Sequence, residues 1–307
     1  MTRTDPTSAR SCPVCHAPLA EQSPEIRGPR GFAVNPAFDP ALRERGVVCA
    51  SCHVRRHQRF GPPRRDGSTG SRAPRATLPH GGVTRTPTFL ASEFCASCHQ
   101  FGPEGFAVNG KLVQNTFEEW KASPAAGQGV QCQDCHMPDR RHLWRGIHDP
   151  EMVRSGVDVD LVVNTGVAGE VNASLVLRNV GVGHFFPTYV TPRVVARIEL
   201  IAAGGDGVEG SVEARIIGRT VNLDLTRELA DTRIPPGGRF ELAYRRPVDQ
   251  PGLRLRATVT VFPDHFYTGF FEALLAGGAG AGTAQIREAL AETQRSAYEL
   301  FSREVPL

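Results

Sequence analysis

The chain has 307 residues and a formal net charge of +3, and its length is sufficient for two domains. It contains no run of about 18 apolar residues, which excludes an ordinary transmembrane helix. The charge is unevenly distributed, since residues 1–150 carry 19 Lys plus Arg against 13 Asp plus Glu. Acidic residues are interspersed among these cations and no nucleic-acid-binding signature is recognisable, so nucleic acid is not an expected partner.

The cysteines form a single pattern. All eight belong to four Cys-x-x-Cys-His motifs within the first 136 residues. The motifs contain Cys12, Cys15 and His16; Cys49, Cys52 and His53; Cys95, Cys98 and His99; and Cys132, Cys135 and His136. Two thiols at this spacing can both reach the vinyl groups of one porphyrin, and the adjacent histidine becomes the proximal iron ligand. The sequence therefore predicts four covalently bound haem c groups.

Zinc is the main alternative for paired cysteines, because two Cys-x-x-Cys pairs can hold one structural ion. Zinc does not require a histidine after every second cysteine, and only 10 of the 307 residues are histidine. Disulfides are disfavoured because cysteines this close do not cross-link long loops. Of the 19 cations in residues 1–150, 17 are arginine, which suits bidentate pairing with haem propionates.

The first half of the chain contains an internal repeat. The motifs begin at residues 12, 49, 95 and 132, so the two outer gaps are equal. Residues 28–35 match residues 102–109 at seven of eight positions. This pattern predicts a duplicated dihaem module with copies at about 12–61 and 95–146.

Little regular structure is predicted between the motifs. The segment 62–88 is rich in Pro, Arg, Gly and Ser and is predicted to be a long loop. Asn115 and Glu118 predict a capping box for a helix that runs to Lys121. Elsewhere we expect short helices and coil. With roughly 38 residues per haem, this region can hardly build an ordinary core, so the porphyrins must contribute much of its apolar interior.

Six histidines remain as possible sixth ligands of the irons. In order of preference the candidates are His57, His142, His184, His80 and His148. The first two occupy matching places in the repeat, whereas His184 follows a glycine-rich turn from which it could reach across a domain interface. Its alternative role is that of an ordinary turn residue, and His265 is predicted to be a loop histidine flanked by aromatic residues. Two protein ligands on every iron favour electron transfer, while an open iron would permit small-molecule redox chemistry.

From Val157 onward the hydrophobic period changes to two, which is typical of half-buried β-strands. About seven alternating sets predict an antiparallel, immunoglobulin-like β-sandwich over 153–280. The sets span residues 157–161, 171–177, 196–200, 212–216, 221–225, 240–244 and 253–261. An amphipathic helix is predicted over 284–304, within the C-terminal segment 281–307, with Leu300 and Phe301 on its apolar stripe. No catalytic constellation is recognisable in this half, so no catalytic residue is predicted.

The fourth motif, Cys132-Gln133-Asp134-Cys135-His136-Met137-Pro138, with His142 downstream, resembles a large multihaem cytochrome c family. That family includes the tetrahaem electron acceptor of hydroxylamine oxidoreductase. Residues 94–120 are similar to its third-haem segment, and the turn Gly183–Thr188 resembles one in β-domains fused to such cytochromes. The resemblance covers roughly residues 90–195 well. It implies periplasmic or extracellular electron transfer through mostly bis-histidine haems, although some relatives have a five-coordinate haem. The lysine-terminated motif of dedicated nitrite reductases is missing from this chain.

The sequence as a whole predicts an α+β multidomain protein. We expect a haem-organised, mostly helical and coil tetrahaem domain at 1–152, then the sandwich and the C-terminal helix. The expected function is electron transfer between redox partner proteins, with docking or self-assembly through the sandwich or the helix. Alternatives are an oxidoreductase with one open haem acting on a small nitrogen or sulfur species, and a subunit of an extracellular haem conduit or filament. Covalent haem is attached after export, so a periplasmic or extracellular location is expected although Met1–Pro6 lacks a signal-peptide h-region.

Overall fold

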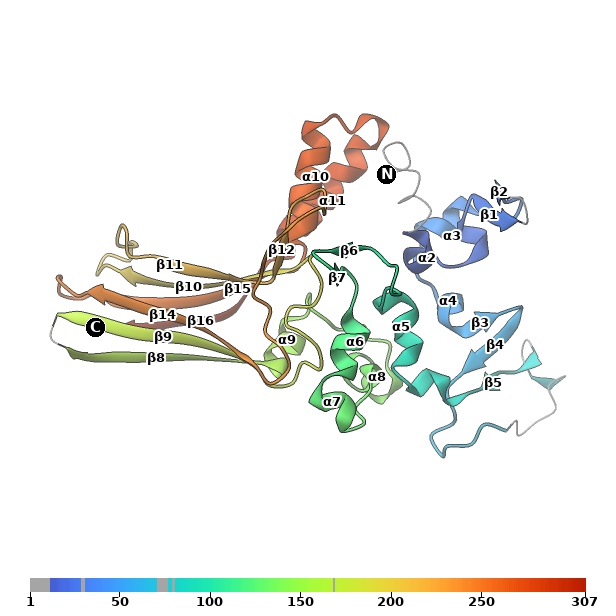
Figure 1. Cartoon of the computed structure of the whole chain (residues 1–307), viewed down its shortest axis with the longest axis horizontal. Coiled ribbons are helices and arrows are strands. Elements are labelled where there is room, and N and C mark those ends of the chain that lie inside the picture. The colour runs from blue at the N-terminus through green and yellow to red at the C-terminus, as the bar shows by residue number, and fades with distance from the viewer. Residues whose placement is uncertain (1–11, 29–30, 71–76, 79–80, 168) are drawn as a thin grey trace. The chain divides into compact units, whose positions relative to one another are not determined.

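A computed structural model describes residues 12–28, 31–70, 77–78, 81–167 and 169–307 (Figure 1). The chain divides into two compact units, Met1–His99 and Gln100–Leu307. Three of the four Cys-x-x-Cys-His motifs belong to the first unit. The fourth belongs to the same unit as the long β-strands, so this unit combines residues that the sequence assigns to different domains. Among the described residues, no helix has both the length and the apolarity needed to cross a bilayer.

Short elements build the first unit, in agreement with its lack of hydrophobic periodicity. In chain order they are α2 (Pro13–His16), η1 (Ala20–Gln22), β1 (Glu25–Gly28), β2 (Gly31–Val34), α3 (Pro40–Glu44), α4 (Cys49–His53), β3 (Val54–Arg55), β4 (Gln58–Gly61), β5 (Thr84–Arg85), η4 (Pro87–Leu90) and α5 (Glu93–His99). Strands β1 and β2 form an antiparallel hairpin, and β3, β4 and β5 form a three-stranded sheet in that order. The small strands were not predicted.

Buried side-chain amides tie the loops of the first unit together. Gln22 is fully buried, and its Nε2 donates to the carbonyl oxygens of Leu42 at 2.9 Å and Gly46 at 2.6 Å. The Nδ2 of buried Asn35 donates to the carbonyl oxygen of Ser23 at 2.8 Å. These contacts satisfy loop carbonyls that a coil-rich segment would otherwise leave unpaired. Polar bonds, rather than apolar packing, therefore hold this unit's loops.

The second unit begins with small elements around the fourth motif. They are β6 (Ala107–Val108), β7 (Lys111–Leu112), α6 (Thr116–Lys121), α7 (Pro124–Gly127), α8 (Cys132–His136), η5 (Pro138–Arg140) and α9 (Pro150–Gly156). Helix α6 is the helix that the sequence predicts, but the predicted capping box is not formed. Gln100 takes its place, because its Oε1 accepts from the Glu118 amide at 3.1 Å and its Nε2 donates to Asn115 Oδ1 at 3.0 Å.

The long strands of the second unit form two antiparallel sheets. One has the order β14-β9-β8, and the other has the order β11-β10-β15-β16. The strands are β8 (Val157–Val167), β9 (Glu170–Asn179), β10 (Arg193–Ile201), β11 (Glu213–Ile217), β14 (Arg239–Pro247), β15 (Arg254–Phe262) and β16 (Tyr298–Pro306). A small hairpin of β12 (Arg219–Val221) and β13 (Glu228–Asp231) lies outside both sheets.

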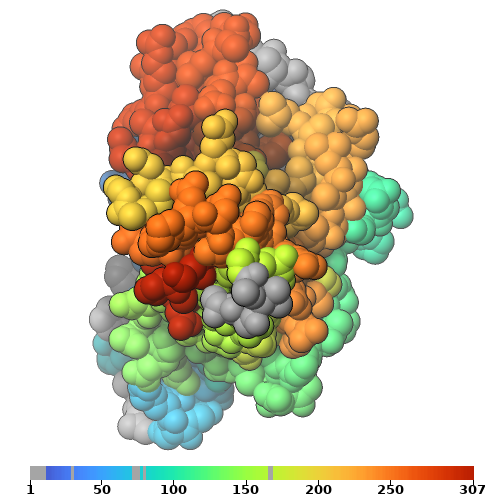
Figure 2. All heavy atoms as spheres, turned by 90° about the vertical axis from the view of Figure 1, so that its left-hand side faces the viewer, coloured from blue at the N-terminus to red at the C-terminus, as the bar shows by residue number. Residues whose placement is uncertain are grey.

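The two sheets share one hydrophobic core. Leu175, Leu177, Ile198, Leu255 and Val259 from β9, β10 and β15 are all fully buried. Each such side chain contributes about 1.5–3 kcal/mol through its removal from water. The sheets are visible as two layers in Figure 1. Figure 2 shows their far end, where the β14–β15 connection lies between the β10–β11 connection and the β8–β9 turn.

Two of the predicted strands differ from the structure. The 212–216 set was expected to face inward, but Val212 is 40% exposed and the fully buried residue of β11 is Ile217. The 221–225 set was expected to be a strand, but β12 ends at Val221. A turn follows because Asn222 Oδ1 accepts from the Arg227 amide at 2.8 Å, which a continuing strand could not allow.

The C-terminal segment also differs from its prediction. Helix α11 (Thr283–Arg295) ends early, and residues 298–306 form strand β16, so the helix prediction is wrong beyond Arg295. Strand β16 pairs with β15 and buries Leu300 in the shared core, which satisfies an otherwise open sheet edge. His265, expected in a loop, is the first residue of an unpredicted aromatic-rich helix, α10 (His265–Ala276), which contacts α11.

Candidate functional site

Each Cys-x-x-Cys-His motif forms about one turn of helix that ends at its histidine, in α2, α4, α5 and α8. This local fold has a geometric consequence, because residues three apart lie on the same face of a helix. Both cysteines of a motif therefore face the same side. All eight thiols are free of disulfides, and each is exposed or half-buried. His16 and His99 are exposed, while His53 and His136 are half-buried.

Two proximal histidines are oriented by the same kind of hydrogen bond. His53 Nδ1 lies 2.8 Å from the carbonyl oxygen of Phe60, and His136 Nδ1 lies 2.5 Å from that of Arg145. Both acceptors directly precede a glycine, at corresponding places in the two copies of the repeat. When Nδ1 donates to a carbonyl, the lone pair is on Nε2, and this arrangement is typical of histidines that bind metal. In both motifs Nε2 is thus the nitrogen that would bind iron.

Thiols from all three motifs interact within the first unit. Burial, together with the neighbouring Cys98 and Cys12 thiols, raises the pKa of the Cys15 thiol to about 11. Burial also raises the pKa of Cys52, against the lowering effect of Arg55, with Cys98 again adding to the rise. Cys98 therefore interacts with one cysteine of each of the other two motifs. Cysteines from all three motifs of this unit therefore lie close to one another.

His136 of the fourth motif is paired with His184. Their ring centroids are 6.4 Å apart and their planes differ by only 5°. A metal–imidazole bond of about 2 Å, with the nitrogen about 1.1 Å from its ring centroid, separates two centroids across one metal by roughly 6.3 Å. The observed spacing would allow both imidazoles to be ligands of one metal ion. His184 Nδ1 lies 2.9 Å from the Phe185 carbonyl oxygen, an orientation that again places the lone pair on Nε2.

Tight local packing fixes the turn that carries His184. Asn179 is 1% exposed, and its side chain donates to the His184 carbonyl oxygen at 3.0 Å and accepts from the Val182 amide at 3.0 Å. A Cβ on Gly183 would lie 3.3 Å from Ala125 Cβ of α7 and 3.4 Å from Trp120 Cδ1 of α6. The turn therefore packs directly against both helices, and a side chain here would require Ala125 to shift slightly. The Trp120 indole in turn donates to the carbonyl of Val130, two residues before the fourth motif, at 2.9 Å.

The other candidate distal ligands have different surroundings. His57 is exposed at the tip of the β3–β4 hairpin, and His142 is exposed with its ring 5.9 Å from that of Trp144. The side chain of His148 is 59% exposed, and its Nε2 lies 2.8 Å from Asp264 Oδ2, so the nitrogen needed for iron is engaged. His80 lies outside the described residues.

Backbone φ angles after the motifs show how the two copies of the repeat align. In each copy, two residues with positive φ stand third and fourth after the proximal histidine; these are Arg56 and His57 in one copy and Asp139 and Arg140 in the other. By this count His57 falls opposite Arg140, and His142 lies two residues further along. Aligning His57 with His142 therefore requires two additional residues in the second copy, and these residues follow the positive-φ turn.

The motif-bearing segments expose apolar surface that suits a flat apolar group. Among the described residues before 153, only Ala17 and Val108 are buried hydrophobics. Large apolar side chains there that are exposed are Val14, Ile26, Phe32, Val34, Val47, Val83, Leu90, Phe106, Leu143 and Trp144. Together with the paired thiols and the His136–His184 spacing, these surfaces fit covalently attached haem. Among the described residues, no group of three or more His, Cys, Asp or Glu side chains that could hold a metal ion is found.

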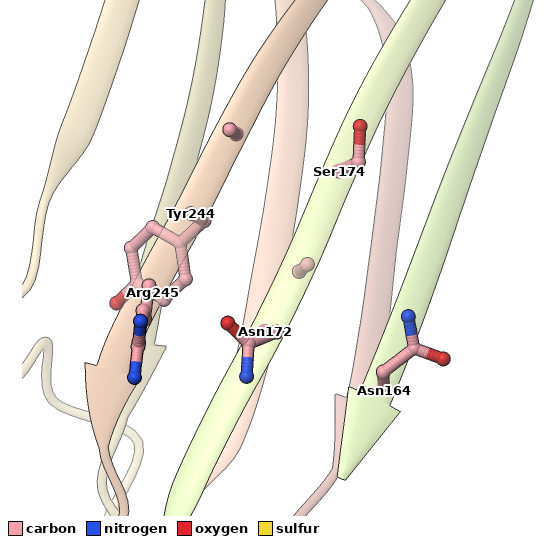
Figure 3. Close-up of a pocket in the computed structure, with 7 residues that line it drawn as sticks. Asn164, Asn172, Ser174, Tyr244 and Arg245 are labelled. Atoms are coloured by element: carbon pink, nitrogen blue, oxygen red, sulfur yellow. The ribbon is translucent and has the colours of Figure 1, made fainter. Parts of the chain in front are cut away.

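A depression of about 430 Å³ lies elsewhere, on the sheet β14-β9-β8 (Figure 3). Its polar lining includes Asn172, Ser174 and Arg245. Ser174 Oγ donates to Glu241 at 2.7 Å, while Asn172 and Arg245 both contact Glu170, at 2.9 and 2.8 Å. These polar groups pair with one another on the surface of the sheet. The depression contains none of the cysteines or histidines of the four motifs.

Comparison with known proteins identifies the fold. No protein-family model matches the chain, and no curated protein matches it. Among solved structures, a penta-haem cytochrome c552 from Thermochromatium tepidum is similar, with a TM-score of 0.62 at 15% sequence identity over 100% of this chain and 92% of that chain. A structural genomics target, SoR45, covers 36% of this chain and 75% of that chain at 11% identity with a TM-score of 0.21, which is too low to carry an argument. This chain thus has the fold of a multihaem cytochrome.

The sequence singled out His184 as a candidate distal ligand, but it predicted neither the proximity of His184 to His136 nor the contacts that hold the His184 turn. The glycine-rich turn around it signalled a constrained loop, without showing which motif the imidazole would meet. Supporting contacts from Asn179, Glu119 and Trp120 were not predicted, because they join segments far apart in the chain.

Proposed function

We propose that the protein is an exported tetrahaem c-type cytochrome that carries electrons between redox partner proteins. The observation that carries the proposal is the His136–His184 pair, with centroids 6.4 Å apart and nearly parallel planes. Two histidines on one iron leave no position for a substrate, which suits electron transfer better than small-molecule chemistry. The multihaem cytochrome fold supports the same conclusion.

Four haems are proposed because every cysteine of the chain is part of one of four motifs. The similar solved structure is described as penta-haem, but a fifth attachment site would require cysteines that this chain does not have. Cys12, Cys49, Cys95 and Cys132 would each share a haem with the second cysteine of their motif. The histidine that closes each motif would be the proximal ligand.

We propose His184 as the distal ligand of the haem held by the fourth motif. The two-sheet region would then be a β-sandwich module that contributes an axial ligand to the haem region. His57 and His142 remain candidates for irons of the other motifs. His148 is a weaker candidate, because binding iron would require its Nε2 to leave Asp264.

The location follows from the cofactor. Covalent haem attachment implies maturation outside the cytoplasm, so we propose a periplasmic or extracellular protein that docks with other redox proteins. The arginine-rich composition of residues 1–150 would pair with haem propionates.

A haem count combined with a spin-state measurement tests this function. The pyridine haemochrome assay should give four haems per chain, and the ferric protein should be low-spin by electron paramagnetic resonance, with no change on adding cyanide or nitrite. A high-spin signal that cyanide or nitrite converts would contradict the carrier and favour the oxidoreductase with one open haem. A count of two or fewer would contradict the assignment of the motifs.

A further inference from the structure

A buried carboxylate lies directly behind the turn that carries His184. Glu119 belongs to α6, and its side chain is only 5% exposed. Its Oε2 accepts a hydrogen bond from the Phe185 amide at 3.2 Å and another from the Thr188 hydroxyl at 3.1 Å. One oxygen of this side chain thus holds the turn on both sides of the Phe186–Pro187 bond, beginning at the residue next to His184.

The second oxygen of Glu119 is held by a buried arginine. Arg233 is 8% exposed in its side chain, and its Nη1 donates to Glu119 Oε1 at 2.8 Å. Its Nε and Nη2 donate to the two oxygens of Asp231 at 2.8 and 3.0 Å, and its guanidinium lies 4.9 Å from the centre of the Phe185 ring. Arg233 therefore contacts both the carboxylate and the residue that follows His184.

The arginine is itself fixed by a charged neighbour. Burial raises the pKa of Asp231, but hydrogen bonds from Arg233 and Lys111 outweigh it and hold that pKa well below its usual range. Asp231 is consequently ionised at neutral pH. The guanidinium is anchored between two carboxylates, and its orientation toward the His184 turn is set by charge and geometry together.

We infer that Glu119 and Arg233 are positioning residues that hold the His184 imidazole at bonding distance from the iron of the fourth motif. The inference rests on the proposed function, because it assumes that His184 is the distal ligand. It extends that function by assigning the control of one haem's coordination to a buried ion pair that holds the His184 turn. Loosening the pair should release His184 from the iron while the protein keeps its fold.

Only a carboxylate satisfies all the donors around this position. The Phe185 amide and the Thr188 hydroxyl approach one oxygen, and the Arg233 guanidinium approaches the other. A glutamine has one accepting oxygen, and its NH₂ group would face a donor in either orientation. The Glu119→Gln substitution therefore preserves the shape of the side chain but sets a donor against a donor.

The chain provides a matched control in Glu228. Its carboxylate is 7% exposed in the side chain and is paired with Arg219, which is 1% exposed, at 2.8 Å. It also accepts from Lys111 at 2.8 Å. Arg219 donates to the carbonyl oxygens of Val108 and Leu112, at 2.9 and 2.7 Å, so this pair holds the β6–β7 hairpin rather than the His184 turn. Glu228→Gln should therefore lower stability without changing the coordination of the fourth haem.

The experiment compares full-length, haem-loaded Glu119→Gln and Glu228→Gln proteins by electron paramagnetic resonance and optical spectroscopy. We expect Glu119→Gln to convert a fraction of the haem, up to one in four, to a high-spin form. Free imidazole in the buffer should restore the low-spin spectrum by replacing the released side chain. Glu228→Gln should stay low-spin. Thr188→Val, which removes one donor and keeps the ion pair, should give a smaller high-spin fraction.

Three results would overturn the inference. The first is a low-spin Glu119→Gln protein with reduced thermal stability, which would make the pair merely structural. The second is an equal high-spin fraction in the Glu228→Gln protein, which would indicate general loosening. If Glu119→Gln does not fold, a fully low-spin Thr188→Val protein is the third. A His184→Ala protein measured beside them distinguishes failure of the positioning inference from failure of the proposed function. A low-spin spectrum of that variant would contradict the assignment of His184 as a ligand.

Discussion

Among the described residues, the buried hydrophobic side chains of residues 12–152 are only Ala17 and Val108, whereas residues 153–307 contain the whole core shared by the two sheets. The two regions have similar lengths but obtain their interiors differently. Residues 153–307 bury their own leucine, isoleucine and valine side chains. Residues 12–152 offer paired thiols, histidines and exposed apolar surface to a cofactor. The haem groups would therefore form much of the interior of residues 12–152. Residues 153–307 have their own interior and would contribute only an axial ligand to one haem.

Removing haem should have the largest effect, and this effect should be confined to residues 12–152. If the full chain is produced without haem attachment, residues 12–152 should lose their amide protection, because no apolar interior remains to offset the conformational entropy of ordering them. The β9, β10 and β15 amides should stay protected. Hydrogen exchange with mass spectrometry measures both regions in one sample, with the haem-loaded chain as reference.

The β6–β7 hairpin is a defined exception in the first region. Arg219 reaches it with three carbonyl hydrogen bonds, to Val108, Lys111 and Leu112. We expect partial protection there without haem. Protection spread over the four motif helices of the haem-free chain would contradict the view that haem forms their interior.

A core substitution in the two-sheet region should have a smaller and more local effect. Leu175→Ala removes a fully buried side chain from β9 and should lower the free energy of unfolding by about 2–5 kcal/mol. The haem absorption spectrum should not change under native conditions. The matched control is Val162→Ala on the adjacent strand β8, where the side chain is 45% exposed and the expected change is within about 0.5 kcal/mol.

Urea unfolding followed by the exchange protection of β9 and β10 measures this change. A loss of the low-spin haem spectrum at the same urea concentration in wild type and variant would indicate that the regions unfold independently. A parallel shift of both transitions would instead show that the two regions unfold as one cooperative unit, in which the fourth haem is linked to the sheets.

The sequence predicted those features that depend on local pattern. Alternating hydrophobic residues predicted β9, β10, β14 and β15 with their inward faces. The four motif spacings predicted four haem attachment sites, which stay a prediction. Strand β16 could not be predicted in this way, because the apolar residues of 284–304 also have the spacing of an amphipathic helix. Pairing with the open edge of β15 decides the conformation after Arg295, and that edge is known only once the sheet is formed.

The repeated octapeptide shows the same limit. Val34 and Val108 occupy equivalent positions in sequences that match at seven of eight residues. Val34 is 83% exposed at the end of β2, whereas Val108 is 2% exposed because Arg219 covers the β6–β7 hairpin. Identical local sequence cannot specify burial that a residue more than a hundred positions away provides. The pairing of His136 with His184 is long-range in the same sense.

The most direct test of the central claim is the spin state of the His184→Ala protein. If the two-sheet region contributes the distal ligand of the fourth haem, this variant should show one high-spin haem in four that binds added imidazole or cyanide. The control His148→Ala, at an exposed histidine whose Nε2 faces Asp264, should stay fully low-spin. A His184→Ala protein with four low-spin haems and no response to imidazole would contradict the account.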